Sequence, residues 1–165
     1  MHINSNNVDN VDQNACEIIH DNAKIQQEKF QVRLENYLKM YYKKEFSLDY
    51  RIKSVEKMMG KIQLRRKQYG QAYGAQNLPD IIGFRLSVST EDEVIELSNL
   101  IEKGLNPTRK VDHFVTPTNS GFKANLYYFN LNGVNIEIQV MTNEMELWTN
   151  QTHDEYNSRT YGITK

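Results

Sequence analysis

Asn132 and Gly133 constrain the fold more than any other pair of residues, because they join two strand-like runs, of which the second alternates apolar and polar residues. An Asn-Gly pair between such runs is the strongest short-range signal for a two-residue β-hairpin. The runs read ANLYYFNL before the pair and VNIEIQVMT after it. In the second run, apolar residues at positions 136, 138 and 140 alternate with Glu137 and Gln139, which is typical of a half-buried strand. The sequence therefore predicts two antiparallel strands with one apolar and one polar face.

The remaining segments predict a mixture of helices and strands around this hairpin. Helical patterning covers about residues 15–45, 54–70 and 90–104 and a last stretch after residue 142, and the last three segments each open on a capping residue: Ser54, Thr90 and Thr142. Strand patterning covers residues 46–53, 81–89 and 110–115. This order predicts an α+β domain with a mixed sheet of about five strands and flanking helices.

The length of 165 residues is enough for one domain with a substantial core. Residues 1–14 are rich in Asn and Asp with little to bury, so we expect a mobile tail there. We expect residues 15–165 to form a single domain, with N-terminal helices over about 15–45 and its main core over about 46–160.

Composition excludes several classes of protein. The net charge of −1 provides no global attraction to nucleic acid or membranes, so any anion site must come from a local cluster of Lys and Arg. The single cysteine, Cys16, excludes an internal disulfide and a multi-cysteine zinc site. No apolar run approaches the roughly 18 residues of a membrane span, and the N-terminus lacks the pattern of a signal peptide. We therefore expect a cytoplasmic protein.

Basic residues cluster where an expected strand ends and a helix begins. Guanidinium and ammonium groups at a helix N-terminus are complementary to phosphates, although a solvated basic face would give the same pattern. The cluster consists of Arg51, Lys53, Lys57 and Lys61, with Arg65, Arg66 and Lys67 further along the helix.

Two other positions are candidates for a nucleotide site. Asp80 is a lone acid directly before an apolar strand, where a turn residue would also be ordinary. Phe122 follows a glycine in the loop TPTNSGFKA and offers either a core side chain or a surface on which a base stacks. With Glu137 and Gln139 they make a set of separate, individually weak signals.

The order and spacing of these motifs give the set its specificity. RIKSVEK, PDIIGFR and EIQVMT, followed by a helix with Trp148 and His153, extend over about residues 48 to 156. This pattern resembles the synthetase domain of the RelA/SpoT family, and in size it is similar to the small alarmone synthetases and their toxin relatives. The resemblance implies a nucleotidyltransferase-like fold and a GTP pyrophosphokinase. Such enzymes transfer the β,γ-pyrophosphate of ATP to the 3′-hydroxyl of GDP or GTP and make the alarmone (p)ppGpp.

The resemblance implies an ATP site on the basic cluster. Arg51 matches an arginine that stacks on adenine, and Lys53 matches a neighbour that contacts the phosphates. The family has a serine and a lysine at set distances along the helix, and Ser54 is the candidate for that serine although it comes early. Either Lys57 or Lys61 matches the lysine that binds phosphate, and the sequence leaves that choice open.

The resemblance also implies a Mg²⁺ site and an acceptor site. Asp80 and Glu137 match the two metal-binding carboxylates, and Glu137 is placed to help deprotonate the acceptor hydroxyl. Arg85 ends the motif that contains Asp80. The residues that match positions near the acceptor nucleotide are Phe122, Gln139 and His153. Two carboxylates without a set of Cys or His ligands favour a hard cation such as Mg²⁺, which suits pyrophosphoryl transfer.

The acceptor side departs from the family pattern. Phe122 and Leu126 stand where family members usually have Tyr and His, and Thr118 and Met141 replace usual basic residues. The acceptor therefore stays open among GDP or GTP, an adenine nucleotide, and the 3′ end of tRNA that toxin relatives modify. A catalytically inactive nucleotide-binding relative is a further alternative. A homo-oligomer and an antitoxin-like protein are the partners that the resemblance implies.

Overall fold

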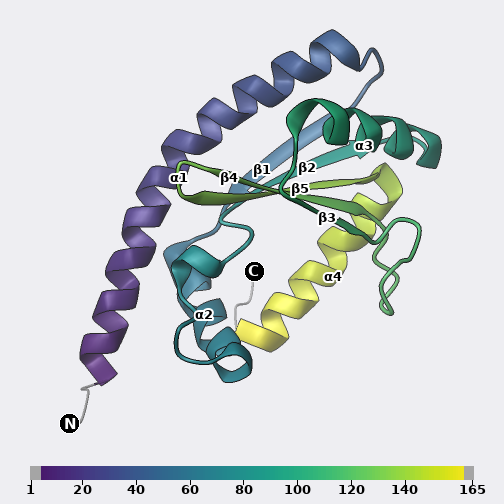
Figure 1. Ribbon diagram of the computed structural model, residues 1–165. Coiled ribbons are helices and arrows are strands. Elements are labelled where there is room, and N and C mark those ends of the chain that lie inside the picture. Colours follow the sequence, from purple (N-terminus) through teal and green to yellow (C-terminus); the bar gives the residue numbers. More distant parts are fainter. Residues whose placement is uncertain (1–4, 162–165) are drawn as a thin grey trace.

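The structure of the chain is a computed structural model that describes the backbone of residues 5–161 and the side chains of residues 10–152. The helices and strands follow one another in the order that the sequence predicts, and they form one sheet with flanking helices (Figure 1). The elements are α1 (Ser5–Tyr41), β1 (Ser47–Ile52), α2 (Val55–Tyr69), a short 3-10 helix η1 (Ala75–Asn77), β2 (Ile82–Val88), α3 (Glu91–Leu105), β3 (Arg109–Asp112), β4 (Asn125–Leu131), β5 (Val134–Thr142) and α4 (Asn143–Tyr161).

The sheet is mixed and has five strands in the order β1-β2-β5-β4-β3, which confirms the predicted fold class. Only β2 and β5 pair in parallel; the other three neighbouring pairs are antiparallel. The predicted hairpin joins β4 to β5, with Leu131 opposite Val134. Asn132 and Gly133 form its two-residue turn with φ angles of 51° and 87°, a conformation that Asn and Gly adopt most readily.

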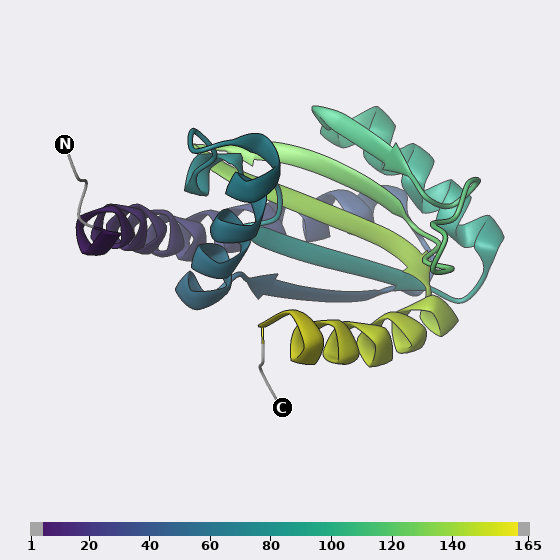
Figure 2. The same cartoon turned by 90° about the horizontal axis from the view of Figure 1, so that it is seen from below.

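The apolar face of the sheet packs against α1 and α3. The Phe30 ring on α1 lies 5.3 Å from the rings of both Phe84 and Phe129, measured between centroids. On the side of α3, the Tyr127 hydroxyl donates to the Ser98 carbonyl. The apolar residues at positions 136, 138 and 140 are completely buried in this layer. The opposite, polar face of the sheet is flanked by α4 (Figure 2).

α1 is one continuous helix and begins at Ser5, so residues 5–14 are helical. The helix therefore begins earlier than the predicted helical segment over 15–45 and includes part of the stretch expected to be a tail. The Arg66 guanidinium on α2 donates two hydrogen bonds to the Asp12 carboxylate and a third to the Tyr73 carbonyl. A long-range ion pair, which local composition does not reveal, thus fastens the start of α1.

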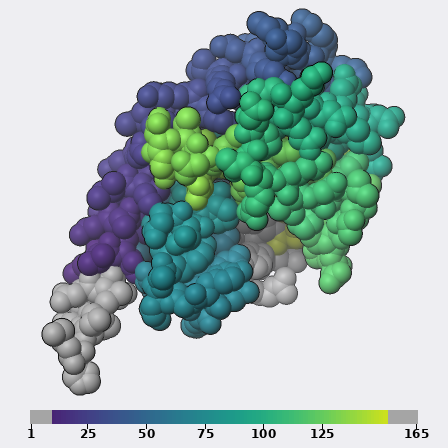
Figure 3. Space-filling view, in the orientation of Figure 1, coloured from purple at the N-terminus to yellow at the C-terminus, as the bar shows by residue number. Residues whose placement is uncertain are grey.

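The turn of the β4–β5 hairpin rests on α1, and the two lie side by side at the surface (Figure 3). The Asn132 side chain donates to Gln26, and Asn22 donates to the Asn132 carbonyl. The hairpin that carries the polar residues of β5 is therefore anchored at its tip.

Three hydroxyl side chains begin helices as the sequence predicts. Ser54, Thr90 and Thr142 each accept a hydrogen bond from a backbone N–H three residues later, at the starts of α2, α3 and α4. β3 is shorter than the expected strand over 110–115, because the Asp112 carboxylate accepts the N–H groups of residues 114 and 115 and turns the chain. In the described part of the chain, no helix is long and apolar enough to cross a membrane.

Candidate active site

Strand register brings five residues into one row across the polar face of the sheet. Arg51 on β1 is opposite Gly83 on β2, and Gly83 is opposite Glu137 on β5. Glu137 is in turn opposite Tyr128 on β4, and Tyr128 is opposite Arg109 on β3. Because residues that are directly paired across strands project to the same face, all the side chains of this row lie on the polar face.

Gly83 separates the arginine from the glutamate in this row. A Cβ atom at position 83 would lie 3.8 Å from Cγ and 3.9 Å from Nε of Arg51. The Arg51 side chain therefore lies across the strand at Gly83, on the path toward Glu137. A larger residue at position 83 would occupy that path.

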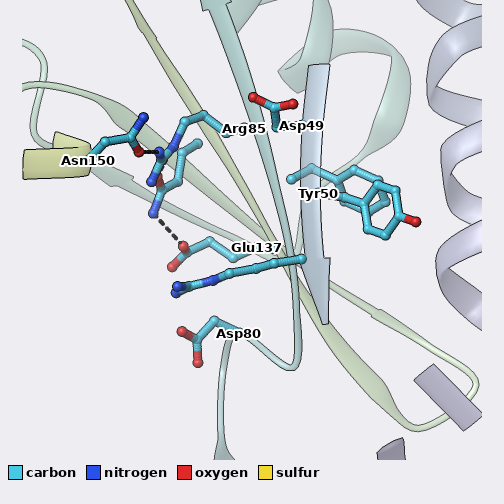
Figure 4. Close-up of a pocket in the computed structure, with 10 residues that line it drawn as sticks. Asp49, Tyr50, Asp80, Arg85, Glu137 and Asn150 are labelled. Atoms are coloured by element: carbon cyan, nitrogen blue, oxygen red, sulfur yellow. Dashed lines mark hydrogen bonds between the residues drawn. The ribbon is translucent and has the colours of Figure 1, made fainter. Parts of the chain in front are cut away.

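A second row extends the polar face toward α4 (Figure 4). Arg85 is paired with Gln139 in the parallel register, and its Nε donates to Gln139 Oε1 at 3.2 Å. The amide of Gln139 donates to Glu137 Oε1 at 2.9 Å. Arg85 Nη1 also donates to Asn150 Oδ1 on α4 at 2.7 Å. This chain of hydrogen bonds connects α4 to the Glu137 carboxylate through two side chains of the sheet.

Asp80 lies directly before β2 and is held by two lysines. Lys53 Nζ lies 3.2 Å from Asp80 Oδ2, and Lys61 Nζ lies 3.9 Å from the same oxygen. Burial by itself would raise the pKa of Asp80, but the charges of Lys53, Lys61 and Arg51 outweigh it, so the pKa lies below its ordinary value. Asp80 is therefore ionised at neutral pH despite being buried.

The two carboxylates fit a hard divalent cation. Asp80 Oδ1 is buried and has no hydrogen-bond partner among the described residues, so one oxygen is left to coordinate a ligand. Figure 4 shows the Glu137 and Asp80 carboxylates on the same side of the sheet, while the Tyr50 ring points away from them. Within the described residues no cluster of three or more acidic, His or Cys side chains forms. Two carboxylates suffice for a metal that takes its other ligands from water and substrate phosphates.

These groups line a pocket of about 220 Å³ on the polar face. Charged and amide side chains from three strands and α4 converge there, and this chemistry matches a polyanionic ligand with a cation. The lining residues are Asp49, Tyr50, Arg51, Asp80, Gly83, Phe84, Arg85, Glu137, Gln139 and Asn150.

Most of the site residues predicted from sequence meet here. Five of them line the pocket: Arg51, Asp80, Arg85, Glu137 and Gln139. Lys53 and Lys61 join the cluster through Asp80, and Lys57 is not among the ion-pair partners of that acid in the described structure. The Ser54 hydroxyl caps α2 by accepting the Lys57 N–H. The side chain of His153 lies outside the described residues.

The Phe122 side chain has a different setting from the pocket residues. Its ring packs with Leu126 and Met141 in a small apolar cluster and meets the His113 ring edge-on at 6.2 Å between centroids. Leu126 and Met141 replace a usual His and a usual basic residue, and both are buried. The substitutions at positions 122, 126 and 141 thus form one apolar patch, and Phe122 is not among the residues that line the pocket.

Sequence reasoning missed four residues of the site. Asp49 and Asn150 line the pocket, Gly83 leaves the path for Arg51, and Tyr128 stands beside Glu137. Asp49 and Tyr128 have the period-2 spacing of the predicted strands, so the sequence could have predicted the face of its strand on which each side chain lies. The register that places them next to the site was not, because no strand pairing except the hairpin follows from the sequence.

Comparison with known proteins identifies the family. Residues 50–160 match the model described as a region found in RelA / SpoT proteins. The match covers well over half of the chain, so the chain belongs to the RelA/SpoT family. No protein with a curated description matches the sequence.

Solved structures show the same fold at low sequence identity. Small alarmone synthetase 2 from Bacillus subtilis matches with a TM-score of 0.64 and 19% identity, over 92% of this chain and 83% of that one. Small alarmone synthetase 1 from Bacillus subtilis, bound to its product pppGpp, matches with a TM-score of 0.62 and 21% identity, over 81% and 76%. The type VI effector Tas1, in complex with its immunity protein, matches with a TM-score of 0.55 and 18% identity, over 78% and 62%.

Proposed function

We propose that the protein is a pyrophosphokinase that transfers the β,γ-pyrophosphate of ATP to the 3′-hydroxyl of GDP or GTP and makes (p)ppGpp. The observation that carries this proposal is the convergence of Asp80 and Glu137 with the cations of Arg51, Lys53 and Lys61 around one pocket. Membership of the RelA/SpoT family supports the same chemistry, as does the product pppGpp in one structural neighbour.

The reaction needs a base and charge neutralisation. The 3′-oxygen of the acceptor attacks the β-phosphorus of ATP, the bond from that phosphorus to the α-phosphate oxygen breaks, and AMP leaves. The hydroxyl proton passes to the Glu137 carboxylate, whose position is fixed by the hydrogen bond from Gln139. Positioning and electrostatic stabilisation account for most of the catalysis of such transfers.

The cations of the site have different roles in positioning and charge neutralisation. Lys61 is 23% exposed and is able to reach a bound phosphate, whereas Lys53 is 7% exposed and holds Asp80 in place. Arg51 lies at the side of the pocket formed by β1, where its flat guanidinium would stack on adenine. Asp80 and Glu137 would hold Mg²⁺, which when bound neutralises the ATP phosphates and orients the acceptor oxygen.

A free nucleotide is favoured over tRNA as the acceptor. A tRNA site needs a continuous cationic surface, and the basic run of α2 does not provide one. Lys61 faces Asp80 and Arg66 is bound to Asp12, so two of the five cations of α2 are engaged by acids inside the fold. Two other acceptors, an adenine nucleotide and tRNA, remain alternatives, as does a protein that binds nucleotides without catalysis. One structural neighbour is an effector in complex with its immunity protein, so a protein partner that inhibits the activity is a further alternative.

One assay distinguishes these acceptors. The protein is incubated with Mg²⁺ and ATP labelled in the γ-phosphate, and GDP, GTP, unlabelled ATP or tRNA is added in turn. We expect label in GDP or GTP and an equal amount of AMP. AMP, rather than ADP, shows that the pyrophosphate moved as a unit. If the label instead appears in a 3′-pyrophosphorylated ATP or in tRNA, the acceptor differs from the proposed one and the pyrophosphoryl transfer itself stands.

Two variants test the role of the site in this assay. Glu137→Gln keeps the size of the side chain and removes its charge, so we expect a loss of activity of at least about 100-fold. Glu28→Gln, on the exposed side of α1, is the matched control and should leave the rate unchanged. The proposal fails if no acceptor gains label, or if Glu137→Gln transfers pyrophosphate as fast as the parent.

A further inference from the structure

We propose that Tyr128 is a positioning residue for Glu137, and that its hydroxyl, backed by Arg109, holds the carboxylate in the orientation that binds the cation and receives the proton. None of the motifs that identify the family includes either residue. The inference rests on the proposed function, because Glu137 needs a fixed orientation only if it works in such a site.

The first argument is the register of the hairpin. Tyr128 and Glu137 are directly opposite each other on β4 and β5. Opposed residues of antiparallel strands have Cβ atoms about 5 Å apart, so a tyrosine here must pass beside the glutamate. Burial, followed by the charge of the Glu137 carboxylate, raises the pKa of Tyr128, and the charge of Asp80 adds to this shift. Both carboxylates therefore lie close enough to act on the phenol.

The second argument is that the tyrosine ring is itself held. The Arg109 guanidinium lies over the ring, 4.1 Å from its centroid, from the paired position on β3. The ring also packs against the apolar cluster that contains Leu126 and Met141. A cation–π contact on the ring and apolar contacts around it restrict the side chain to one position. The hydroxyl is thus presented to Glu137 from a rigid support.

The third argument is that Glu137 has polar neighbours on two sides. Gln139 donates to its carboxylate from two residues along the same strand, and Tyr128 lies opposite it on the neighbouring strand. An ionised carboxylate has about four acceptor sites, so two such partners do not exhaust it. Hydrogen-bond partners of this kind orient carboxylates that bind metals, and losing one typically costs 10–100-fold in metal affinity or activity.

The substitution Tyr128→Phe tests this role, because it removes the hydroxyl and keeps the ring under Arg109. The matched control is Tyr127→Phe, which makes the same change one residue earlier on the opposite face. There the hydroxyl donates a 3.4 Å hydrogen bond to the Ser98 carbonyl, away from the pocket. Two properties are measured for each purified protein: kcat and KM for ATP in the transfer assay, and the affinity for Mn²⁺ alone from the relaxation of water protons.

We expect Tyr128→Phe to lower kcat about 10-fold, to leave KM for ATP within about twofold, and to weaken Mn²⁺ binding by a similar factor of about 10. Tyr127→Phe should keep the parental values of all three. Should Tyr128→Phe fail to fold, Arg109→Gln loosens the ring without removing the hydroxyl and should shift kcat and Mn²⁺ affinity in the same direction by a smaller factor.

The outcomes separate this inference from the proposed function. If the parent is active and Tyr128→Phe matches it in kcat and Mn²⁺ affinity, Tyr128 has no positioning role and the function stands. Equal losses in Tyr127→Phe would also overturn the role, because the effect would then come from the sheet as a whole. If the parent transfers nothing to any acceptor but Tyr128→Phe weakens Mn²⁺ binding, the function fails and the positioning role stands. If the parent is active but binds no Mn²⁺ without ATP, the function stands, and an unchanged kcat in Tyr128→Phe would then overturn the positioning role.

Discussion

The Lys53 ammonium lies 3.2 Å from the Asp80 carboxylate, and the two side chains are only 7% and 11% exposed. Such a pair gains little over an apolar pair of the same size, because both charges lose their hydration. Removing one member is costly, since the remaining charge stays buried without its partner. Asp80 thus contributes both to the stability of the fold and to the proposed cation site.

The first prediction concerns that double role. Asp80→Asn should lower the free energy of unfolding by about 3 kcal/mol, because Lys53 is left buried without a carboxylate. Urea unfolding followed by circular dichroism measures the change. Asp21→Asn is the control, since the Asp21 side chain is 80% exposed and should change the stability by less than about 0.5 kcal/mol. An Asp80→Asn protein as stable as the parent would show that the pair contributes nothing to the fold.

The second prediction concerns the lysine that binds phosphate. The structure places Lys61, one turn beyond Lys57 on α2, within 3.9 Å of Asp80. Lys61→Met should therefore lower kcat/KM for ATP by about 100-fold, the effect of losing one well-placed charge in the transition state. Lys57→Met should have a clearly smaller effect. Steady-state kinetics with varied ATP measures both, and a reversed order of the two effects would assign the phosphate contact to Lys57.

The parts of the fold that the sequence predicted correctly have local causes. The alternation on β5 and the Asn132-Gly133 turn are properties of neighbouring residues, and both are present in the structure. The starts of α2, α3 and α4 depend on single hydroxyl side chains, so these boundaries were also predictable. The end of β3 was not, because Asp112 reads equally well as a strand residue and as a turn residue.

The site was predicted as a set of residues, and the structure supplies their spatial relations. The motif order brought Asp80 and Glu137 into one hypothesis. That Gly83 separates Arg51 from Glu137, and that Tyr128 flanks the glutamate, follows from strand register alone. Phe122 shows how packing adds to such a set. Its position in a glycine-containing loop left a core side chain and a stacking surface both open, and in the structure its half-buried ring packs against Leu126 and Met141.

The third prediction concerns the start of α1. The Asp12 carboxylate and the Arg66 guanidinium are 14% and 16% exposed and form a two-pronged pair, which is stronger than an ordinary surface ion pair. Asp12→Ala should lower the free energy of unfolding by about 1–2 kcal/mol. Hydrogen exchange should also show faster exchange of the amides in residues 5–14. Asn14→Ala, at an exposed position of the same helix, should change neither property; unchanged exchange in Asp12→Ala would show that another contact holds this segment.

The fourth prediction concerns Tyr42, whose hydroxyl is buried without a hydrogen-bond partner among the described residues. An unpaired buried hydroxyl costs roughly 1–3 kcal/mol, so Tyr42→Phe should be more stable than the parent by about 1 kcal/mol at neutral pH.

The same substitution should change the response to alkaline pH. Burial, followed by the charges of Glu93 and Glu96, raises the pKa of Tyr42 to about 12, against 10.0 for an ordinary tyrosine. The folded protein therefore keeps the phenol neutral at pH values where the unfolded protein releases its proton. Below pH 10 the phenol is neutral in both states, and as the pH rises from 10 toward 12 its ionisation in the unfolded state lowers the free energy of unfolding. Urea unfolding at several values of pH from 8 to 12 should give a shallower decline for Tyr42→Phe than for the parent. Tyr69→Phe, at a side chain that is 61% exposed, should follow the parent throughout. Identical declines for Tyr42→Phe and the parent would mean that the Tyr42 hydroxyl reaches solvent or a partner in the folded protein.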